Sequence, residues 1–369
     1  MKPKEITRRE FISDAALAAG TVSACALAAN AADTRSQNIL NYNPNMEYRR
    51  LGKTGLMVSA VCLGGHWKRV HTMLGGRLAD SEGYSKNDLD NIKNTDFIKS
   101  RSDVVSRCID VGINYVDACA GPEVLAYSRV LRGRRNKMYL GYSWHVKESR
   151  YAEQRSAKKL VQGLEEGLRE AQLDYVDVWR ISLPQDMIPN YDELLALEAG
   201  AVEALDIAKK QGKARFTGIS THNRVWLKSL IEQYPKQIEV VLFPYTANSK
   251  ELPNDSVFDA IKKNDVGVFG IKPFADNALF FGDGSLASPH ADEDSRRARL
   301  AIRYILGNSA ITAPIPGMIN IHQVDNMVKA VQERRKLDLK ENAELEEAGK
   351  RMWASLRTDH QWLKDWEYV

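Results

Sequence analysis

The sequence predicts an α/β protein folded as a (β/α)8 barrel of the TIM type, and three observations support this. Eight short apolar runs alternate along the chain with stretches of helical periodicity. The chain has 369 residues, which accommodates one barrel of about 250 residues with extensions at its ends. Its 44% hydrophobic and 27% charged residues are typical of a globular domain and exclude a disordered, collagen-like or coiled-coil chain.

The eight apolar runs are short enough to be buried strands. They are Val58–Gly64, Ile113–Cys119, Met138–Ser143, Tyr175–Ser182, Ala214–Thr221, Val240–Tyr245, Gly267–Pro273 and Ile311–Pro316. Helical patterns with apolar residues three and four apart lie between them, as in Ala157–Ala171, Leu194–Lys210 and Arg296–Leu306. Short buried strands that alternate with helices are typical of parallel sheets, and eight such units predict a closed barrel.

In such a barrel the active site lies at the carboxyl ends of the strands. Two long segments follow strands at that end, residues 66–99 after the first and 275–295 after the seventh. Long loops in a compact domain are usually lids or binding loops, and we expect that role here, with a solvated insertion as the alternative. We expect the aromatic tail to pack on the outside of the barrel rather than form a pocket wall. Its rings are Trp353, Trp362, Trp366 and Tyr368.

The first 31 residues resemble a bacterial twin-arginine export signal. Arg8 and Arg9 are followed by Phe11 and then by an uncharged Ala/Gly-rich run that is too short and too weakly apolar for a stable membrane span. We expect cleavage after Ala31 and a soluble periplasmic protein, with the twin-arginine translocation machinery as its partner during export. The rival is a lipoprotein-type cleavage that leaves an acylated Cys25, and an ordinary disordered N-terminus is the third interpretation.

The predicted mature chain divides into a polar linker over 32–45, the barrel over 46–335 and a C-terminal helix with an aromatic tail over 336–369. We expect no integral membrane segment in it. The net charge of +4 is spread without a Lys/Arg block, which argues against a nucleic-acid partner. The cysteines form no CxxC pattern, so neither a metal site nor a disulfide framework is predicted. They are Cys25, Cys62, Cys108 and Cys119.

Six runs, taken together in their order and spacing, resemble the aldo-keto reductase family over about residues 46–335. They are Tyr48–Gly55, Val61–Gly65, Gly112–Asp117, Leu173–Asp177, Gly212–Ser220 and Ile315–Met318. The resemblance implies a carbonyl reductase or alcohol dehydrogenase that binds NADP or NAD across the top of the barrel without a Rossmann domain. The predicted substrate is a small polar carbonyl or alcohol, with a sugar as one candidate.

The family's chemistry uses an Asp, a Tyr that protonates the new alkoxide, a Lys and a His. The resemblance places Asp117 at the Asp position, but Pro122, Ser143 and Ser182 at the other three. A positioned general acid contributes roughly 10²–10⁴ in rate, so the usual mechanism cannot operate unchanged. Arg180 lies two residues before Ser182, on the same inward face by the period of a strand. We therefore predict that Arg180 forms an ion pair with Asp117.

A replacement proton donor has to come from the loops. His145 and His66 are the candidates, because both follow strand ends and imidazole titrates near neutrality. The predicted function is thus a nicotinamide-dependent oxidoreductase with a rearranged acid–base group. A non-redox enzyme on the same barrel, such as a lyase or isomerase, and a ligand-binding barrel without turnover are the alternatives. The resemblance also implies cofactor-binding positions at Ser220, Lys272, Gly317, Met318, Asn320, Gln323 and Asn326.

Overall fold

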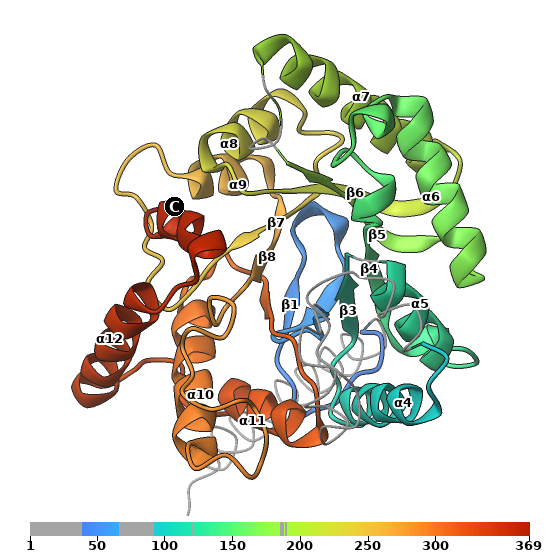
Figure 1. Cartoon of the computed structure of the whole chain (residues 1–369). Helices are drawn as coiled ribbons and strands as arrows, with labels where there is room; N and C mark the ends of the chain where they lie inside the picture. The colour runs from blue at the N-terminus through green and yellow to red at the C-terminus, as the bar shows by residue number, and fades with distance from the viewer. Residues whose placement is uncertain (1–38, 66–91, 120, 185–187, 189) are drawn as a thin grey trace, which may run out of the picture.

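A computed structural model describes residues 39–65, 92–119, 121–184, 188 and 190–369. The expected export signal at 1–31, the first half of the expected linker (32–38) and His66 lie outside these described residues. None of the helices that the structure describes is long and apolar enough to cross a membrane. Figure 1 shows strands at the centre of the molecule with helices arranged around them.

The central sheet contains seven parallel strands, and their order in the sheet is their order along the chain. This arrangement confirms the predicted α/β barrel, whose remaining edges are joined by the segment before β3. The strands of the described chain, including an N-terminal hairpin of β1 and β2, are β1 (Tyr48–Arg50), β2 (Met57–Ser59), β3 (Tyr115–Ala118), β4 (Tyr139–Tyr142), β5 (Val176–Leu183), β6 (Ala214–Thr221), β7 (Val240–Pro244), β8 (Gly267–Ile271) and β9 (Ala313–Ile315).

The first predicted strand, Val58–Gly64, is the one that differs from the structure. Its beginning belongs to β2, which pairs antiparallel with β1 instead of joining the barrel. The chain turns after β2 because Ser59 is held on both sides. Its backbone N–H donates to Asn114 Oδ1 (2.8 Å) and its hydroxyl donates to the Val61 carbonyl (2.7 Å). An apolar run therefore covers two elements that the sequence pattern does not separate.

The end of that run closes the barrel through isolated bridges. Leu63 bridges to Val116 of β3, and Gly64 bridges to Gly317 just after β9. The Leu63 N–H donates to the Tyr115 carbonyl (3.0 Å), and the Gly64 N–H donates to the Pro316 carbonyl (2.9 Å). A side chain at Gly64 would meet the neighbouring backbone, because its Cβ would lie 2.8 Å from the Pro316 oxygen. Glycine is therefore needed for this close approach.

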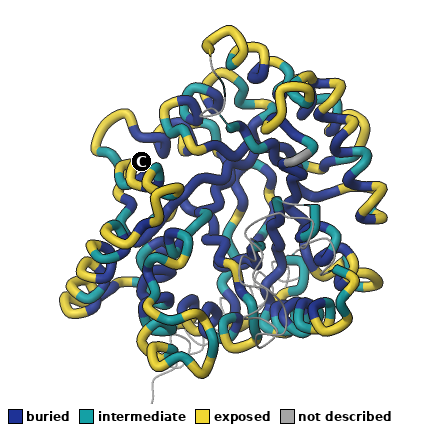
Figure 2. The backbone as a smooth tube through the Cα atoms, in the orientation of Figure 1, coloured by how far each residue is buried: buried dark blue, intermediate teal, exposed yellow. Residues whose placement is uncertain are grey.

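The helices bury their inner faces against the sheet and expose their outer faces, as Figure 2 shows. In α6 the Ser156 side chain caps the N-terminus, and Leu160, Leu164 and Leu168 form the buried face. The bounds of α6 are those predicted, while α7 and α10 extend beyond the predicted stretches. The helices described are α4 (Thr95–Asp110), α5 (Gly121–Val130), α6 (Ala157–Ala171), α7 (Tyr191–Lys210), α8 (Arg224–Gln233), α9 (Val257–Asn264), α10 (Ala291–Gly307), α11 (Ile321–Gln332) and α12 (Leu339–Ala354).

The aromatic tail packs on the outer side of the barrel sheet near the carboxyl ends of its strands, and none of its four rings lines the pocket described below, as expected. A 3-10 helix, η6 (Thr358–Trp366), carries two of its rings. Trp366 is buried and stacks on Phe243 of β7, with centroids 5.3 Å apart. Trp362 stacks on His222 at 3.6 Å, and the Lys272 ammonium lies 5.7 Å from the same ring. His222 and Lys272 both line the pocket described below, so the tail supports the pocket wall.

Candidate active site

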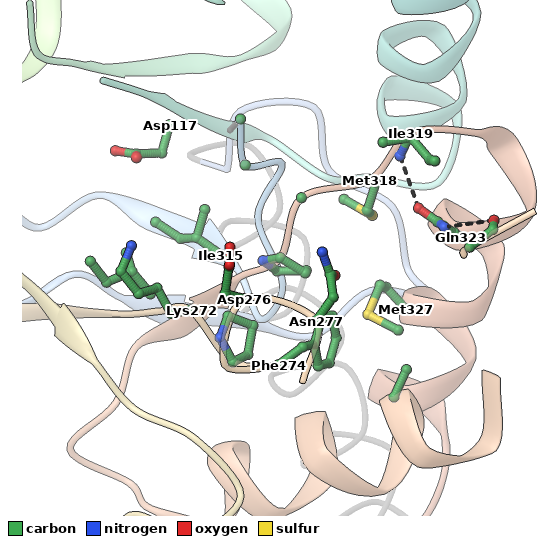
Figure 3. Close-up of a pocket in the computed structure, with 18 of the residues that line it drawn as sticks. Asp117, Lys272, Phe274, Asp276, Asn277, Ile315, Met318, Ile319, Gln323 and Met327 are labelled. Atoms are coloured by element: carbon green, nitrogen blue, oxygen red, sulfur yellow. Dashed lines mark hydrogen bonds between the residues drawn. The ribbon is translucent and has the colours of Figure 1, made fainter. Parts of the chain in front are cut away.

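A cavity of about 380 Å³ opens at the carboxyl ends of the barrel strands. Its residues come from the ends of β3, β5, β6 and β8, the loop after β8 and the start of α11. In Figure 3, Asp117 lies on one side of this pocket and Met327 of α11 on another. The pocket is therefore where the fold places an active site.

Asp117 and Arg180 form a buried ion pair in this pocket, which confirms the prediction. Arg180 donates from Nε to Asp117 Oδ1 (3.0 Å) and from Nη2 to Oδ2 (2.6 Å). The two residues are only 6% and 4% exposed. Gly141 of β4 stands beside Asp117 in register, and the Tyr115 hydroxyl fills the space that a side chain at Gly141 would take. Burial opposes the charge of Arg180, yet pairing with Asp117 outweighs it and raises the pKa of the guanidinium.

Ser143 and Ser182, which the resemblance places at the Lys and His positions, share one carboxylate, Glu148, which the sequence interpretation missed. The Ser143 hydroxyl (2.8 Å) and the Ser182 backbone N–H (2.9 Å) both donate to Glu148 Oε2. The Trp144 backbone N–H donates to Oε1 (2.8 Å), with the Trp179 indole at 3.4 Å from the same oxygen. Burial raises the pKa of Glu148, and these hydrogen bonds partly offset it. Glu148 thus ties the turn after β4 to β5.

A second carboxylate, Glu123, also escaped the sequence interpretation and lines the pocket. Pro122 lies in the first turn of α5 and Glu123 follows it. Helical side chains point back toward the N-terminus, so a given spot is covered by a residue about one position later in the chain. Glu123 is 3% exposed, and its Oε2 accepts from the Cys119 N–H (3.3 Å). The carboxylate beside Pro122 was the available signal in the sequence, because Glu can transfer a proton as Tyr and His can.

His145 lines the same pocket at the start of a short 3-10 helix, η3 (His145–Lys147). Its Nδ1 lies 2.6 Å from the Cys119 carbonyl oxygen. A carbonyl only accepts, so this contact assigns the proton of the neutral ring to Nδ1. His145 therefore lies where the prediction required it, at the end of β4 beside Asp117's strand. His66, the other candidate, lies outside the described residues.

Six of the seven residues at the implied cofactor positions line the pocket: Ser220, Lys272, Gly317, Met318, Gln323 and Asn326. The seventh, Asn320, lies in the turn into α11. The N-terminus of a helix can bind a phosphate through its backbone amides. Asn320 caps α11 by accepting from the Gln323 N–H (2.9 Å), and the Gln323 side chain accepts from the Ile319 N–H (2.9 Å). These two hydrogen bonds fix the backbone of the turn before α11 at the edge of the pocket.

Met318 and Asn326 make hydrogen bonds with neighbouring helices in the same region. Met318 is fully buried, and its carbonyl accepts from the buried Arg101 of α4 (2.9 Å). The Asn326 side chain donates to the Ser295 carbonyl (2.9 Å) and accepts from Arg299 (2.8 Å). These contacts hold α10, α11 and α4 around the pocket. A nucleotide contact for either residue stays a prediction.

The loop after β8 contributes the wall on the α10 side, as expected for the segment 275–295. Three successive residues adopt left-handed backbone, with φ of +49° at Ala275, +57° at Asp276 and +68° at Asn277. Such conformations are costly for residues other than glycine and gather at functional sites. The Gln323 side chain also donates to the Gly284 carbonyl (3.3 Å), which ties this loop to α11. The loop therefore forms part of the pocket wall.

Comparisons with known proteins agree with this geometry. The model of the Aldo/keto reductase family matches residues 99–350. The chain is 25% identical over 320 residues to L-galactose dehydrogenase of Arabidopsis thaliana, a match over 80% of this chain and 91% of that protein. The fold resembles an aldo-keto reductase from Bacillus halodurans. Its holo form has a TM-score of 0.56 at 21% identity, and the match covers 86% of this chain and 99% of that one. Its apo form gives 0.52 at 20% with the same coverage.

Proposed function

This chain belongs to the aldo/keto reductase family, and on that premise we propose that it is an NAD(P)(H)-dependent oxidoreductase with a rearranged acid–base group. The observation that carries the proposal is the Asp117–Arg180 pair inside the pocket at the strand ends. Arg180 provides a cation beside Asp117, although the resemblance places Ser143 where the family has its lysine. A bound nicotinamide would supply or accept the hydride.

The proposed substrate is a small polar carbonyl compound or alcohol, with a sugar favoured. The similarity to L-galactose dehydrogenase supports a sugar. The pocket adds polar groups at the ends of β5 and β6, where Ser182, Ser220 and Thr221 lie. Hydroxyl side chains both donate and accept hydrogen bonds, which suits a polyol.

Arg180 and His145 have separate roles at the substrate oxygen. Arg180 uses Nε and Nη2 for Asp117, and we propose that Nη1 donates to the oxygen that gains negative charge. His145 transfers the proton of that oxygen, since its Nδ1 contact with Cys119 orients the ring. Asp117 keeps the guanidinium in place through two hydrogen bonds.

Nucleotide binding is the first test. We expect NADH, NADPH or both to quench the tryptophan fluorescence of the chain from Ala32 saturably, at micromolar concentrations or below. Oxidation of the bound nucleotide by a panel of aldoses and ketoses then identifies the substrate. The oxidoreductase proposal fails if neither nucleotide binds and none is found bound to the purified protein. Turnover of a sugar without nucleotide would favour the non-redox enzyme, and sugar binding without turnover would favour a binding barrel.

Replacing His145 tests the proton transfer. We expect His145→Gln to lower kcat about 10²–10⁴-fold with nucleotide affinity unchanged, because a positioned general acid–base group contributes that much. Lys158→Gln is the control, since Lys158 is exposed on α6 and does not line the pocket. Equal kcat for the two variants would exclude His145 as the proton-transferring group.

A further inference from the structure

Two titratable side chains of the pocket flank a single residue, Cys119. The Glu123 carboxylate accepts from the Cys119 N–H at 3.3 Å, and His145 Nδ1 lies 2.6 Å from the Cys119 carbonyl oxygen. The N and O atoms of one residue are about 3 Å apart, so the carboxylate and the imidazole lie within about 10 Å of each other. Both line the pocket, as does Cys119 itself. A small substrate can therefore meet both groups at once.

The position of the Glu123 carboxylate is closely defined by its surroundings. A Cβ at Gly65 would lie 2.5 Å from Glu123 Oε2, so the carboxylate occupies the space beside that glycine. The turn from β3 into α5 holds the carboxylate from the other side, through the Cys119 N–H. The side chain is 3% exposed and still lines the cavity. It is thus a carboxylate of defined position in the pocket wall, and the proposed transfer of the alcohol proton by His145 does not require it.

Arg180 completes a set that suits a second kind of proton transfer. Removing a proton from the carbon beside a carbonyl needs a base near that carbon and a cation near the carbonyl oxygen. Glu123 can provide the base, and Arg180, in the same pocket, can stabilise the oxyanion. Asp117 holds the guanidinium from the other side.

We propose that the pocket also enolises its carbonyl substrate, with Glu123 as the base at carbon. The substrate class is a hydroxyketone or hydroxyaldehyde with a hydrogen on the carbon beside the carbonyl. The C–H bond breaks, its proton goes to a Glu123 oxygen, and its electron pair forms the C=C bond of an enolate whose oxygen accepts from Arg180. The carboxyl proton exchanges with solvent, and the proton that then passes from the carboxyl group to carbon exchanges or epimerises that centre. The step consumes no oxidant or reductant. It deepens the proposed function, because it uses the same substrate site.

Solvent exchange tests the proposal without any nucleotide. The full chain is incubated with 1,3-dihydroxyacetone in D2O, and the methylene signal is followed by proton NMR. We expect the signal to fall faster than in buffer alone. Glu123→Gln should slow the protein-dependent rate about 10²-fold or more, because an amide cannot accept the proton. Glu203→Gln, at an exposed site on α7, is the matched control and should keep the wild-type rate.

A second variant covers the case in which Glu123→Gln does not fold. Gly65→Ala places a methyl group against the carboxylate and should displace it while Asp117 and Arg180 stay in place. We expect it to lose exchange and to keep a cooperative thermal transition. Exchange no faster than in buffer, or wild-type exchange in both variants, would overturn the proposal.

The outcomes separate this proposal from the proposed function. Nucleotide binding without exchange leaves the oxidoreductase standing and rejects enolisation. Exchange without nucleotide binding supports enolisation and rejects the oxidoreductase. It would assign the pocket to a non-redox isomerase. Exchange together with nucleotide binding supports both.

Discussion

Arg180→Met is expected to lower the free energy of unfolding by about 3–5 kcal/mol, because removing one partner of a buried ion pair strands the other charge. The stranded group is the Asp117 carboxylate, which keeps 6% of its surface exposed. Both of its oxygens accept from the Arg180 guanidinium in the folded protein. Urea denaturation of the chain from Ala32, followed by circular dichroism, measures the change.

The double variant Asp117→Asn/Arg180→Met distinguishes the effect of losing the ion pair from the effect of leaving one buried charge unpaired. It removes both charges, so we expect it to recover much of the stability lost in the single variant. Arg50→Met is the matched control, since Arg50 pairs with Asp265 at the surface, where both side chains are about half exposed. That change should cost less than about 1 kcal/mol. A similar small cost for Arg180→Met would show that the buried pair does not hold the barrel together.

Glu148→Ala is expected to lower the free energy of unfolding by about 3–5 kcal/mol, because it leaves buried donors without an acceptor. The donors are the Ser143 hydroxyl and the backbone N–H groups of Trp144 and Ser182. Each unsatisfied buried donor costs about 1–3 kcal/mol. Urea denaturation provides the measurement, with Glu153→Ala at an exposed site as the control. A cost below 1 kcal/mol would mean that water replaces the carboxylate.

The same carboxylate predicts a pH dependence of known sign. Burial raises the pKa of Glu148, so the folded protein binds this proton more tightly than the unfolded chain does. The stability from this group is therefore fully present below the unfolded pKa of about 4.3, and it is lost as the pH rises through the raised value. Glu148→Gln stays neutral, so its deficit relative to wild type should be larger at pH 4 than at pH 7. The opposite trend would contradict the direction of the shift.

The ion pair was predictable because it follows from local geometry. Asp117 lies one residue before the end of β3, and Arg180 lies three residues before the end of β5. Inward positions repeat every second residue, so both side chains had to face the barrel interior. A buried carboxylate also needs a partner, which left Arg180 as the available cation.

Glu148 and Glu123 were not predictable in the same way. Glu148 follows β4 in a turn, and its four donors come from two segments that only the fold brings together. Glu123 reaches the pocket because the first turn of α5 directs it back over the end of β3. The irregular turn at Glu148 carries no period from which a side-chain direction could be read, and the direction of Glu123 depends on where α5 begins relative to β3.

The sequence by itself determined the alternation of strands and helices, the parallel barrel and the Asp117–Arg180 pair, because these depend on repeating apolar patterns and on the period of a strand. Only the tertiary structure decided how Val58–Gly64 divides, which rings the aromatic tail stacks on and which carboxylates reach the pocket. These features depend on irregular turns, and the backbone of a turn is set by contacts between segments that are distant in the chain. Such contacts exist only once the barrel has closed.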